Sequence, residues 1–348
     1  MKFDKINIYV PEKIGKILES DADLFEIYKR DGRTVNKNRF LSMLIKGYYN
    51  TYEEESRRII SDIKNVLSGL NVDEDIILEK SIRILNEVIR PKVPLRKGKN
   101  PVRLSLKPTG ETETLINHIL DELGDSDFIS QYFCRLLMSY CDKPFPEREK
   151  IVFAENYRII SEACADRQGI MFNTIWDNEK NHYVCPYKIV TGTEELFNYL
   201  ICCEMDMKNG DLYAKAYRLN RISKPVYSNR VIGIQENIVS RLNKMENTSP
   251  QFAINGDEEI CVKLTAHGEK SFGRIYYGRP KVKRIEINDD ERFYYFNCSE
   301  DQVYLYFRRF DGNDAVIIEP IELRKRMADF HFRAYQKYIE EATRDGYK

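Results

Sequence analysis

Apolar and polar residues alternate in two short segments that lie far apart in the chain. In Lys5–Val10 every second residue is apolar, and Val102–Lys107 shows the same alternation. This period of two predicts strands that bury one face and expose the other. Each strand is followed by two segments with helical spacing and a glycine-containing break between them. The predicted helices run from Pro11 to about Tyr28, from about Asn36 onward, over Glu111–Leu123 and from Asp127 to about Tyr140.

The two strand-helix-helix segments form a degenerate internal repeat. Phe128-Ile129-Ser130 in the second copy matches Phe40-Leu41-Ser42 in the first in type and position. A lone strand cannot satisfy its edges, so we expect the two strands to pair with each other within one chain. The arrangement resembles a ribbon-helix-helix module, here as an intramolecular pair.

This resemblance implies that the outward side chains of the ribbon read the DNA major groove. The candidate DNA-binding residues are Lys5, Asn7, Tyr9, Arg103, Ser105 and Lys107. A ribbon whose polar face is simply exposed to solvent would show the same alternation without binding DNA. Between the two copies we predict helices within Thr51–Leu67 and Asp73–Ile89, and then an exposed basic connector over residues 90–99.

The middle of the chain predicts three consecutive strands, Tyr183–Val190, Leu196–Glu204 and Leu212–Ile222. An Asn-Gly turn separates the second strand from the third. Alternation places Lys215 and Tyr217 on one face of the third strand and Arg218 on the other. Cations interleaved with tyrosines suit a surface that holds phosphate and stacks on bases, although a solvated strand face has the same spacing.

Three motifs in this stretch resemble the WYL domain, a small Sm/SH3-like β-barrel of bacterial regulators and CRISPR-associated proteins. They are Pro186-Tyr187-Lys188-Ile189, Phe197-Asn198-Tyr199-Leu200 and Tyr217-Arg218-Leu219-Asn220-Arg221-Ile222. Asn198 stands where the family has the tryptophan that gives it its name. The resemblance implies a basic, aromatic face that binds nucleic acid or nucleotide-like ligands. The candidate RNA-binding residues are Arg158, Arg167, Lys188, Tyr199, Lys215, Tyr217, Arg218 and Arg221.

The last hundred residues predict a compact α+β unit. Strands are expected at Ile260–Ala266, Lys281–Ile287, Phe293–Asn297 and Ala315–Glu319. A capping box, Ser299-x-x-Gln302, opens one helix, and Pro320 opens a final helix to about Glu341. This part resembles the C-terminal extension of WYL proteins, which implies a ferredoxin-like unit that helps to form a homodimer. The expected class is α+β multidomain, with segments 1–148 (ribbon-helix-helix region with helical insert), 149–225 (WYL domain), 226–250 (helical linker) and 251–348 (extension).

Composition narrows the function further. The chain has 55 Lys and Arg against 55 Asp and Glu, so any nucleic-acid site must be a local patch. Eight cysteines without a Cys-x-x-Cys pair read as buried thiols of a reducing cytosol, and four scattered histidines argue against a zinc site. We expect no metal or other cofactor and no membrane span, and a cytoplasmic location. Trp176, the only tryptophan, is expected to be a core anchor.

The sequence offers no catalytic constellation. Arg326 and His331 have the Arg-x4-His spacing of HEPN ribonucleases, but Met327 follows the arginine and there is no second copy, so chance spacing is the better account. We therefore expect no enzyme.

The combination of ribbon-helix-helix, WYL domain and extension resembles the WYL accessory proteins of type VI-D CRISPR systems. These bind single-stranded RNA and stimulate an RNA-guided ribonuclease, so the expected partners are single-stranded RNA and such a ribonuclease. One alternative is a transcription regulator that binds DNA through the ribbon and uses the WYL domain as a nucleotide or nucleic-acid sensor. Another is a protein-interaction scaffold that binds a nuclease directly.

Overall fold

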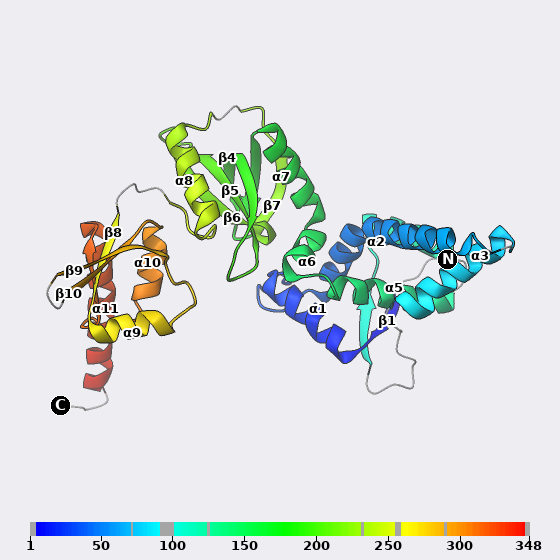
Figure 1. The fold of residues 1–348 in the computed structure, drawn as a ribbon, viewed down its shortest axis with the longest axis horizontal. Coiled ribbons are helices and arrows are strands. Elements are labelled where there is room, and N and C mark those ends of the chain that lie inside the picture. The colour runs from blue at the N-terminus through cyan, green and yellow to red at the C-terminus, as the bar shows by residue number, and fades with distance from the viewer. Residues whose placement is uncertain are drawn as a thin grey trace. The chain divides into compact units, whose positions relative to one another are not determined.

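The computed structural model describes residues 5–70, 72–90, 101–123, 126–230, 233–254, 259–288 and 291–344 (Figure 1). Its internal contacts divide the chain into two compact units. Unit 1 comprises Met1–Arg158 and Leu219–Arg221, and unit 2 comprises Ile159–Arg218 and Ile222–Lys348. The described part has mixed α+β architecture with three antiparallel sheets, which confirms the predicted class. The four finer segments expected from the sequence stay predictions.

Unit 1 contains a two-stranded ribbon. Strand β1 (Ile6–Val10) pairs antiparallel with β2 (Val102–Leu106), and Ile8 lies opposite Leu104. The predicted pairing of two distant strands within one chain is confirmed. The inward side chains are buried except Val102, which is partly exposed, and Ile8 and Leu106 are fully enclosed. Helix α5 packs against β1 and covers this apolar face.

Unit 1 has seven helical segments in its described residues up to Val152. They are α1 (Glu12–Leu24), α2 (Lys37–Leu67), α3 (Glu74–Ile84), the π-helical turn η1 (Leu85–Ile89), α4 (Glu111–Leu123), α5 (Ser126–Cys141) and α6 (Phe145–Val152). Of these, α1, α2 and α5 pack against the ribbon. Helix α1 stops before the predicted Tyr28 because Glu26 has a φ of 59°, which a right-handed helix cannot accommodate. Helix α2 is continuous to Leu67, so the separate helix expected from Thr51 is part of it. Residues 91–99 of the predicted basic connector, the break at Gly124-Asp125 and the side chain of Phe128 lie outside the described residues.

A buried charged network joins three helices of unit 1. The carboxylate of Asp21 on α1 accepts hydrogen bonds from Arg148 Nε on α6 (2.7 Å) and from the Tyr140 hydroxyl on α5 (2.8 Å). Arg148 Nη2 reaches the other carboxylate oxygen at 3.0 Å. Asp21 is only 1% exposed. A buried charge without this bidentate partner would be strongly destabilising, so the network fixes how these helices pack.

Unit 2 begins with a five-stranded sheet in the order β6-β5-β4-β3-β7. Its strands are β3 (Ile170–Thr174), β4 (Asp177–Thr191), β5 (Asn198–Met205), β6 (Leu212–Arg218) and β7 (Ile222–Tyr227). The predicted third strand, Leu212–Ile222, is therefore two strands. A 3₁₀ turn at Leu219–Arg221 redirects the chain, and β7 pairs with β3 instead of continuing beside β5.

Two helices flank this sheet on opposite sides in Figure 1. Helix α8 (Glu236–Asn247) packs on β5 and β6, where Ile238 and Leu242 meet Ile201 and Ala214 in one buried cluster. Helix α7 (Ala154–Asp166) lies on the other side and contains the boundary between the two units. The single helix expected over Lys150–Ala165 is divided between α6 and α7.

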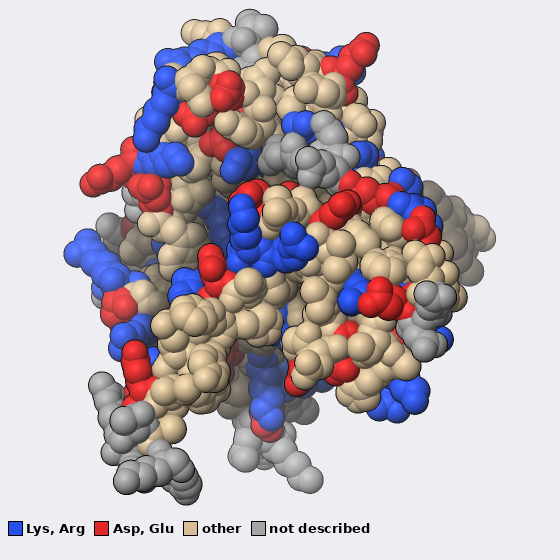
Figure 2. All heavy atoms as spheres, turned by 90° about the vertical axis from the view of Figure 1, so that its left-hand side faces the viewer, with Lys and Arg blue, Asp and Glu red and all other residues tan. Residues whose placement is uncertain are grey.

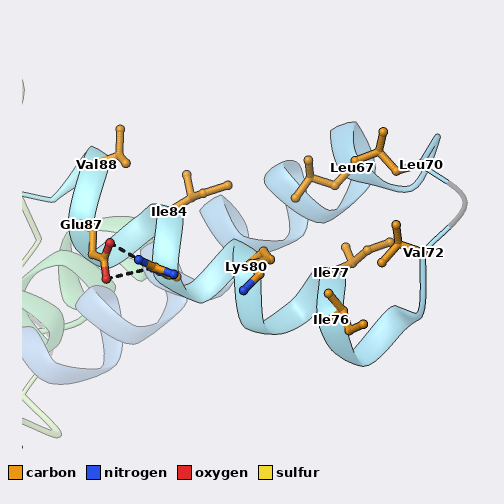
Figure 3. Close-up of a pocket in the computed structure, with 10 residues that line it drawn as sticks. Leu67, Leu70, Val72, Ile76, Ile77, Lys80, Ile84, Glu87 and Val88 are labelled. Carbon is orange, nitrogen blue, oxygen red and sulfur yellow. Dashed lines mark hydrogen bonds and ion pairs between the residues drawn. The ribbon is translucent and has the colours of Figure 1, made fainter.

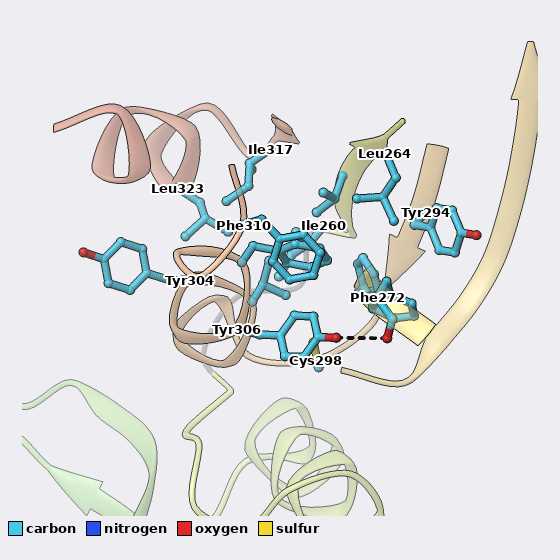
Figure 4. Close-up of a cluster of buried hydrophobic side chains, with 14 residues drawn as sticks. Ile260, Leu264, Phe272, Tyr294, Cys298, Tyr304, Tyr306, Phe310, Ile317 and Leu323 are labelled. Atoms are coloured by element: carbon cyan, nitrogen blue, oxygen red, sulfur yellow. Dashed lines mark hydrogen bonds between the residues drawn. The ribbon is translucent and has the colours of Figure 1, made fainter. Parts of the chain in front are cut away.

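The C-terminal sheet of unit 2 has the strand order β11-β8-β10-β9. Its elements are β8 (Ile260–Leu264), α9 (Ala266–Arg274), β9 (Val282–Asn288), β10 (Glu291–Phe296), α10 (Glu300–Phe307), β11 (Ala315–Glu319) and α11 (Ile321–Arg344). Figure 4 shows Phe272, Tyr306 and Phe310 among the side chains that fill the core between sheet and helices. Helix α9 was not predicted from the sequence.

Of the two hydrogen bonds of the predicted capping box at the start of α10, the structure shows the one accepted by Ser299. Ser299 Oγ accepts the backbone N–H of Asp301 at 3.2 Å, as an N-cap does. The Gln302 side chain does not return to Ser299. Its Nε2 instead donates to the carbonyl of Gly278 at 3.5 Å and so ties α10 to the loop after α9.

Candidate nucleic-acid interface

The pairing of β6 with β5 separates the candidate RNA-binding residues onto two faces. Lys215 lies opposite Cys202 and Tyr217 opposite Leu200, whereas Arg218 lies opposite Tyr199. Directly paired residues share a face, and successive residues alternate. Lys215 and Tyr217 therefore lie on one side of the sheet, and Arg218 and Tyr199 lie on the other. The alternation predicted for this strand is confirmed, but it divides the candidate site.

Tyr217 belongs to a polar cluster rather than to an open stacking surface. Its hydroxyl donates to Glu204 Oε2 at 2.8 Å and lies 2.9 Å from His182 Nδ1, which is itself 2.7 Å from Glu204 Oε1. The Tyr217 ring packs edge-on against Phe172 with centroids 5.0 Å apart. Packed in this way, the ring is not free to stack on a base.

The contacts within this cluster shift the pKa values of Glu204 and Tyr217. Burial alone raises the pKa of the Glu204 carboxyl, but the hydrogen bonds from His182 and Tyr217 outweigh it, and the pKa lies below its ordinary value. Burial, with the nearby Cys202 and Glu204, raises the pKa of the Tyr217 phenol well above its ordinary value. Tyr217 is thus a neutral donor and Glu204 a charged acceptor at neutral pH.

On the other face, Arg218 lies over an aromatic ring. Its guanidinium carbon is 3.4 Å from the centroid of the Phe197 ring, and its Nε is buried without a hydrogen-bond partner among the described residues. The neighbouring Tyr199 is only 4% exposed, and its hydroxyl donates to Glu195 Oε2 at 2.6 Å. Tyr199 is a core residue in this conformation, so the exposed stacking role expected for it is not what the structure shows.

Two further candidate cations are already bound to carboxylates. Lys188 on β4 forms an ion pair with Glu246 of α8. Arg221 forms a bidentate pair with Glu26 within unit 1, through Nη2 at 2.7 Å and Nε at 3.1 Å. A phosphate would have to displace these acidic side chains. Lys188 and Arg221 therefore stabilise the fold through their ion pairs in this structure.

The remaining candidates are the solvent-facing Arg158 and Arg167 and the partly exposed Lys215. Arg158 belongs to unit 1 and Arg167 to unit 2. Arg167 follows the end of α7 with a φ of 52°, and its carbonyl lies 4.0 Å from Cys185 Sγ. Figure 2 shows blue and red side chains interspersed over the face it presents, as the zero net charge predicts. Any attraction for phosphate must come from a few local cations.

The exposure of the Trp176 side chain contradicts the prediction that this residue anchors a core. It lies at the turn between β3 and β4 and is 69% exposed. The hairpin places it there because Thr174 pairs with Asp177, which leaves only two residues at the tip. An exposed indole is a large stacking surface. This exposure was missed from the sequence because the strand after Trp176 was expected to begin at Tyr183, whereas β4 begins at Asp177.

The ribbon of unit 1 has a polar and cationic outer face. Arg103 Nε donates to Asn7 Oδ1 across the strands at 3.1 Å. Asn38 on α2 clamps the end of β2 by donating to the carbonyl of Lys107 and accepting its N–H. The outer face consists of Lys5, Asn7, Tyr9, Arg103, Ser105 and Lys107, as expected from the alternation. Three of these six residues are cationic and none is acidic.

A groove of about 500 Å³ lies between the end of α2 and α3 (Figure 3). Its lining is mainly aliphatic, including Leu67, Leu70 and Ile77, and the rim carries Lys80 and the Arg83–Glu87 ion pair. Such a lining offers few hydrogen-bonding groups to a base or phosphate. The groove is therefore not a nucleic-acid site.

The side chain of Arg326, the arginine of the Arg-x4-His spacing, makes structural contacts within the C-terminal part of unit 2. Its Nη1 donates to Asp301 Oδ1 at 2.6 Å, and its guanidinium lies 4.0 Å from the centre of the Tyr304 ring. Within the described residues, no group of three or more His, Cys, Asp or Glu side chains could hold a metal ion. No helix in the described ranges is long and apolar enough to cross a membrane. The expectations of no enzyme and no cofactor stay predictions.

Comparison with solved structures shows a likeness over nearly the whole chain. A crystal structure described as that of a CRISPR Cas-related protein matches with a TM-score of 0.63 and 20% identity, covering 97% of this chain and 94% of that one. At this identity the likeness is one of fold. Proteasome accessory factor B/C of Arthrobacter aurescens also matches, at 14% identity and a TM-score of 0.27 over 93% of this chain and 54% of that chain, which is too low to support an argument. No family model and no curated protein sequence matches.

Proposed function

We propose that the protein is a single-stranded RNA-binding accessory protein that stimulates an RNA-guided CRISPR ribonuclease. The observation that carries this proposal is the extent of the fold likeness to a CRISPR Cas-related protein, which includes both units and not one shared domain. The protein would act by binding RNA and the ribonuclease, and not by catalysis of its own.

The topology supports the domain types that this proposal requires. In unit 2 the order β6-β5-β4-β3-β7, with a 3₁₀ turn before the last strand, agrees with an Sm/SH3-like WYL barrel. The C-terminal β-α-β-β-α-β succession with order β11-β8-β10-β9 agrees with a ferredoxin-like extension. The intramolecular β1–β2 ribbon followed by helices agrees with a ribbon-helix-helix pair.

We propose fewer RNA-contacting residues than we expected from the sequence. Lys215 and Arg218, on opposite faces of the edge strand β6, would hold the RNA backbone together with Arg167 as the strand passes around that edge. No carboxylate forms an ion pair with any of the three in the described part of the chain. Lys188 and Arg221 would contribute only after losing Glu246 and Glu26. Tyr199 and Tyr217 would support the sheet from within, and Trp176 would replace them as the stacking side chain.

A homodimer is part of the proposal. The second half of α11 exposes Phe332, Tyr335 and Tyr338 at helical spacing. Aromatic side chains on one side of an exposed helix suit burial against a second copy. Sedimentation analysis of the full chain with Phe332→Asp would test this, because the charge should shift a dimer to monomer.

The binding test uses the full-length protein with labelled single-stranded RNA and duplex DNA, including DNA from its own promoter, at about 150 mM salt. The proposal expects tighter binding to single-stranded RNA. The double variant Lys215→Ala/Arg218→Ala should weaken RNA binding at least about tenfold, equivalent to about 1.4 kcal/mol. Tighter binding to duplex DNA, or binding to neither, would contradict the proposal.

A second candidate function is favoured by the ribbon. Its outer face presents Lys5, Arg103 and Lys107 without an acidic residue, which suits contact with duplex DNA in a transcription regulator. Asn7→Ala/Arg103→Ala should then abolish binding to promoter DNA and leave RNA binding intact. If this variant binds promoter DNA normally, the ribbon is not a DNA reader.

A further inference from the structure

The loop between α9 and β9 carries an unusual concentration of positive charge. Residues 274–284 include Arg274, Arg279, Lys281, Lys283 and Arg284, and contain no Asp or Glu. The end of α10 adds two more arginines. Six exposed residues form what we call the Tyr276 surface: Arg274, Tyr276, Arg279, Lys281, Arg308 and Arg309.

Contacts to the core hold this surface in place. The Tyr306 hydroxyl donates to the carbonyl of Ile275 at 2.8 Å and so anchors the loop to α10. The guanidinium of Arg279 lies 5.4 Å from the centre of the Tyr276 ring, and that of Arg309 lies 5.2 Å from the centre of the Tyr306 ring. Burial raises the pKa of Tyr306 to about 12, although both arginines act against the shift. Arg279 thus lies beside the exposed Tyr276, and Arg309 lies beside the buried Tyr306, whose hydroxyl anchors the same loop.

The cations of the Tyr276 surface are not neutralised by carboxylates. No ion pair joins Arg274, Arg279, Lys281, Arg308 or Arg309 to an Asp or Glu within the described residues. Lys283 and Arg284, later in the same basic run, differ because both pair with Glu259.

Two carboxylates at the edge of the surface accept hydrogen bonds from neutral donors. Glu195 accepts from the hydroxyls of Tyr199 and Tyr277, and Glu194 accepts from the N–H of Gly278. These two carboxylates keep their negative charges, but the surface has five cations, so its net charge remains positive.

An exposed aromatic ring with an unpaired arginine beside it, and further unpaired cations on the same loop and helix ends, is suited to a single nucleic-acid strand. Every base offers a π face for stacking, and the cations can contact the backbone between bases. A duplex hides its base faces, and Tyr276, which is 72% exposed, would have no ring to stack on. An acidic protein would use the cations but would gain nothing specific from the tyrosine. The combination favours single-stranded RNA over both.

From these contacts we infer that the Tyr276 surface is a second binding site for single-stranded RNA, in which Tyr276 stacks on a base and Arg279 and Arg309 hold phosphates. The inference rests on the proposed function, because it assigns the RNA-binding protein a further site. The residues come from the C-terminal sheet and its helices, and none was a candidate from the WYL resemblance.

The test measures affinity of the full-length protein for a labelled uridine 20-mer. Tyr276→Ala should weaken binding about 5- to 150-fold through loss of one stacked base, and Tyr276→Phe should bind like the unaltered protein. Arg279→Ala/Arg309→Ala should lower the slope of log K against log salt by about 1.4, that is about 0.7 for each lost phosphate contact. Matched controls are Tyr227→Ala, which removes a tyrosine that is 43% exposed and lies outside the proposed RNA and dimer contacts, and Arg57→Ala/Arg58→Ala on the exposed side of α2.

The outcomes distinguish the Tyr276 surface from the proposed RNA site at Lys215 and Arg218. If Tyr276→Ala and the double arginine variant bind like their controls while Lys215→Ala/Arg218→Ala binds weakly, this inference fails and the proposed function stands. If the Tyr276 variants lose affinity equally for duplex DNA, the surface is a nonspecific cationic patch and the inference fails. If the unaltered protein binds no RNA, both fail. Selective loss of RNA affinity in the Tyr276 variants, with unchanged melting temperature, supports the inference.

Discussion

The Arg218 guanidinium lies 3.4 Å from the centre of the Phe197 ring. Phe197 directly precedes β5 and Arg218 ends β6, so the contact links the two strands where their pairing begins. The ring fixes the orientation of the cation but does not neutralise it. Arg218 is therefore positioned without an acidic partner, which distinguishes it from Lys188 and Arg221.

Replacement of Arg218 by lysine should separate charge from stacking. Lysine keeps the positive charge but loses the planar guanidinium that packs on Phe197. We expect Arg218→Lys to bind single-stranded RNA with an affinity between those of the unaltered protein and Arg218→Ala. Fluorescence anisotropy measures this, and equal affinity of Arg218→Ala and the unaltered protein would remove Arg218 from the site.

Loss of the Tyr217 hydroxyl should affect stability and not RNA binding. Tyr217→Phe keeps the ring against Phe172 but leaves Glu204 with one donor fewer. We expect the free energy of unfolding to fall by about 1 kcal/mol. Urea denaturation gives this value, and a large loss of RNA affinity in the folded variant would instead return Tyr217 to the binding surface.

The lowered pKa of Glu204 predicts a stability component that depends on pH. Its stabilisation is fully present above the unfolded-state pKa of about 4.5 and is lost as the pH falls through the lower folded-state pKa. Glu204→Gln lacks this component. The difference in melting temperature between the unaltered protein and Glu204→Gln should therefore be constant near neutral pH and shrink below about pH 4.5. A difference that grows on acidification would contradict the assignment.

Asp21→Asn should destabilise unit 1 strongly. The substitution removes the charge that compensates Arg148, whose side chain is largely buried between α1 and α6. Breaking such a buried pair from one side typically costs about 3–5 kcal/mol. Thermal unfolding followed by circular dichroism measures the effect. A loss below about 1 kcal/mol would mean that the network does not hold these helices together.

Local patterns predicted much of the fold. The alternation in Lys5–Val10 and Val102–Lys107 identified both strands and their pairing, because a buried ribbon face requires period two. The spacing of residues did not reveal the turn at Leu219–Arg221, because the apolar Leu219 and the following Ile222 made two strands look like one. Helix α9 was missed because its short run, Ala266–Arg274, contains two glycines and has its apolar anchor at Phe272.

The candidate site was less predictable than the fold. Residue type and alternation place a side chain on a face, but they do not show what covers that face or which acid lies opposite. The burial of Tyr199 depends on a loop that brings Glu195 to its hydroxyl, and Arg221 is bound by Glu26 from a distant part of the sequence. The basic run at residues 274–284 was visible in the sequence, but only the structure shows which of its cations lack acidic partners.

The most direct test of the central claim is the rate of target-RNA cleavage by a type VI RNA-guided ribonuclease, with and without this protein. We predict that the unaltered protein raises the rate and that Lys215→Ala/Arg218→Ala at the same concentration raises it less. A rate that is unchanged by the unaltered protein would contradict the proposed function.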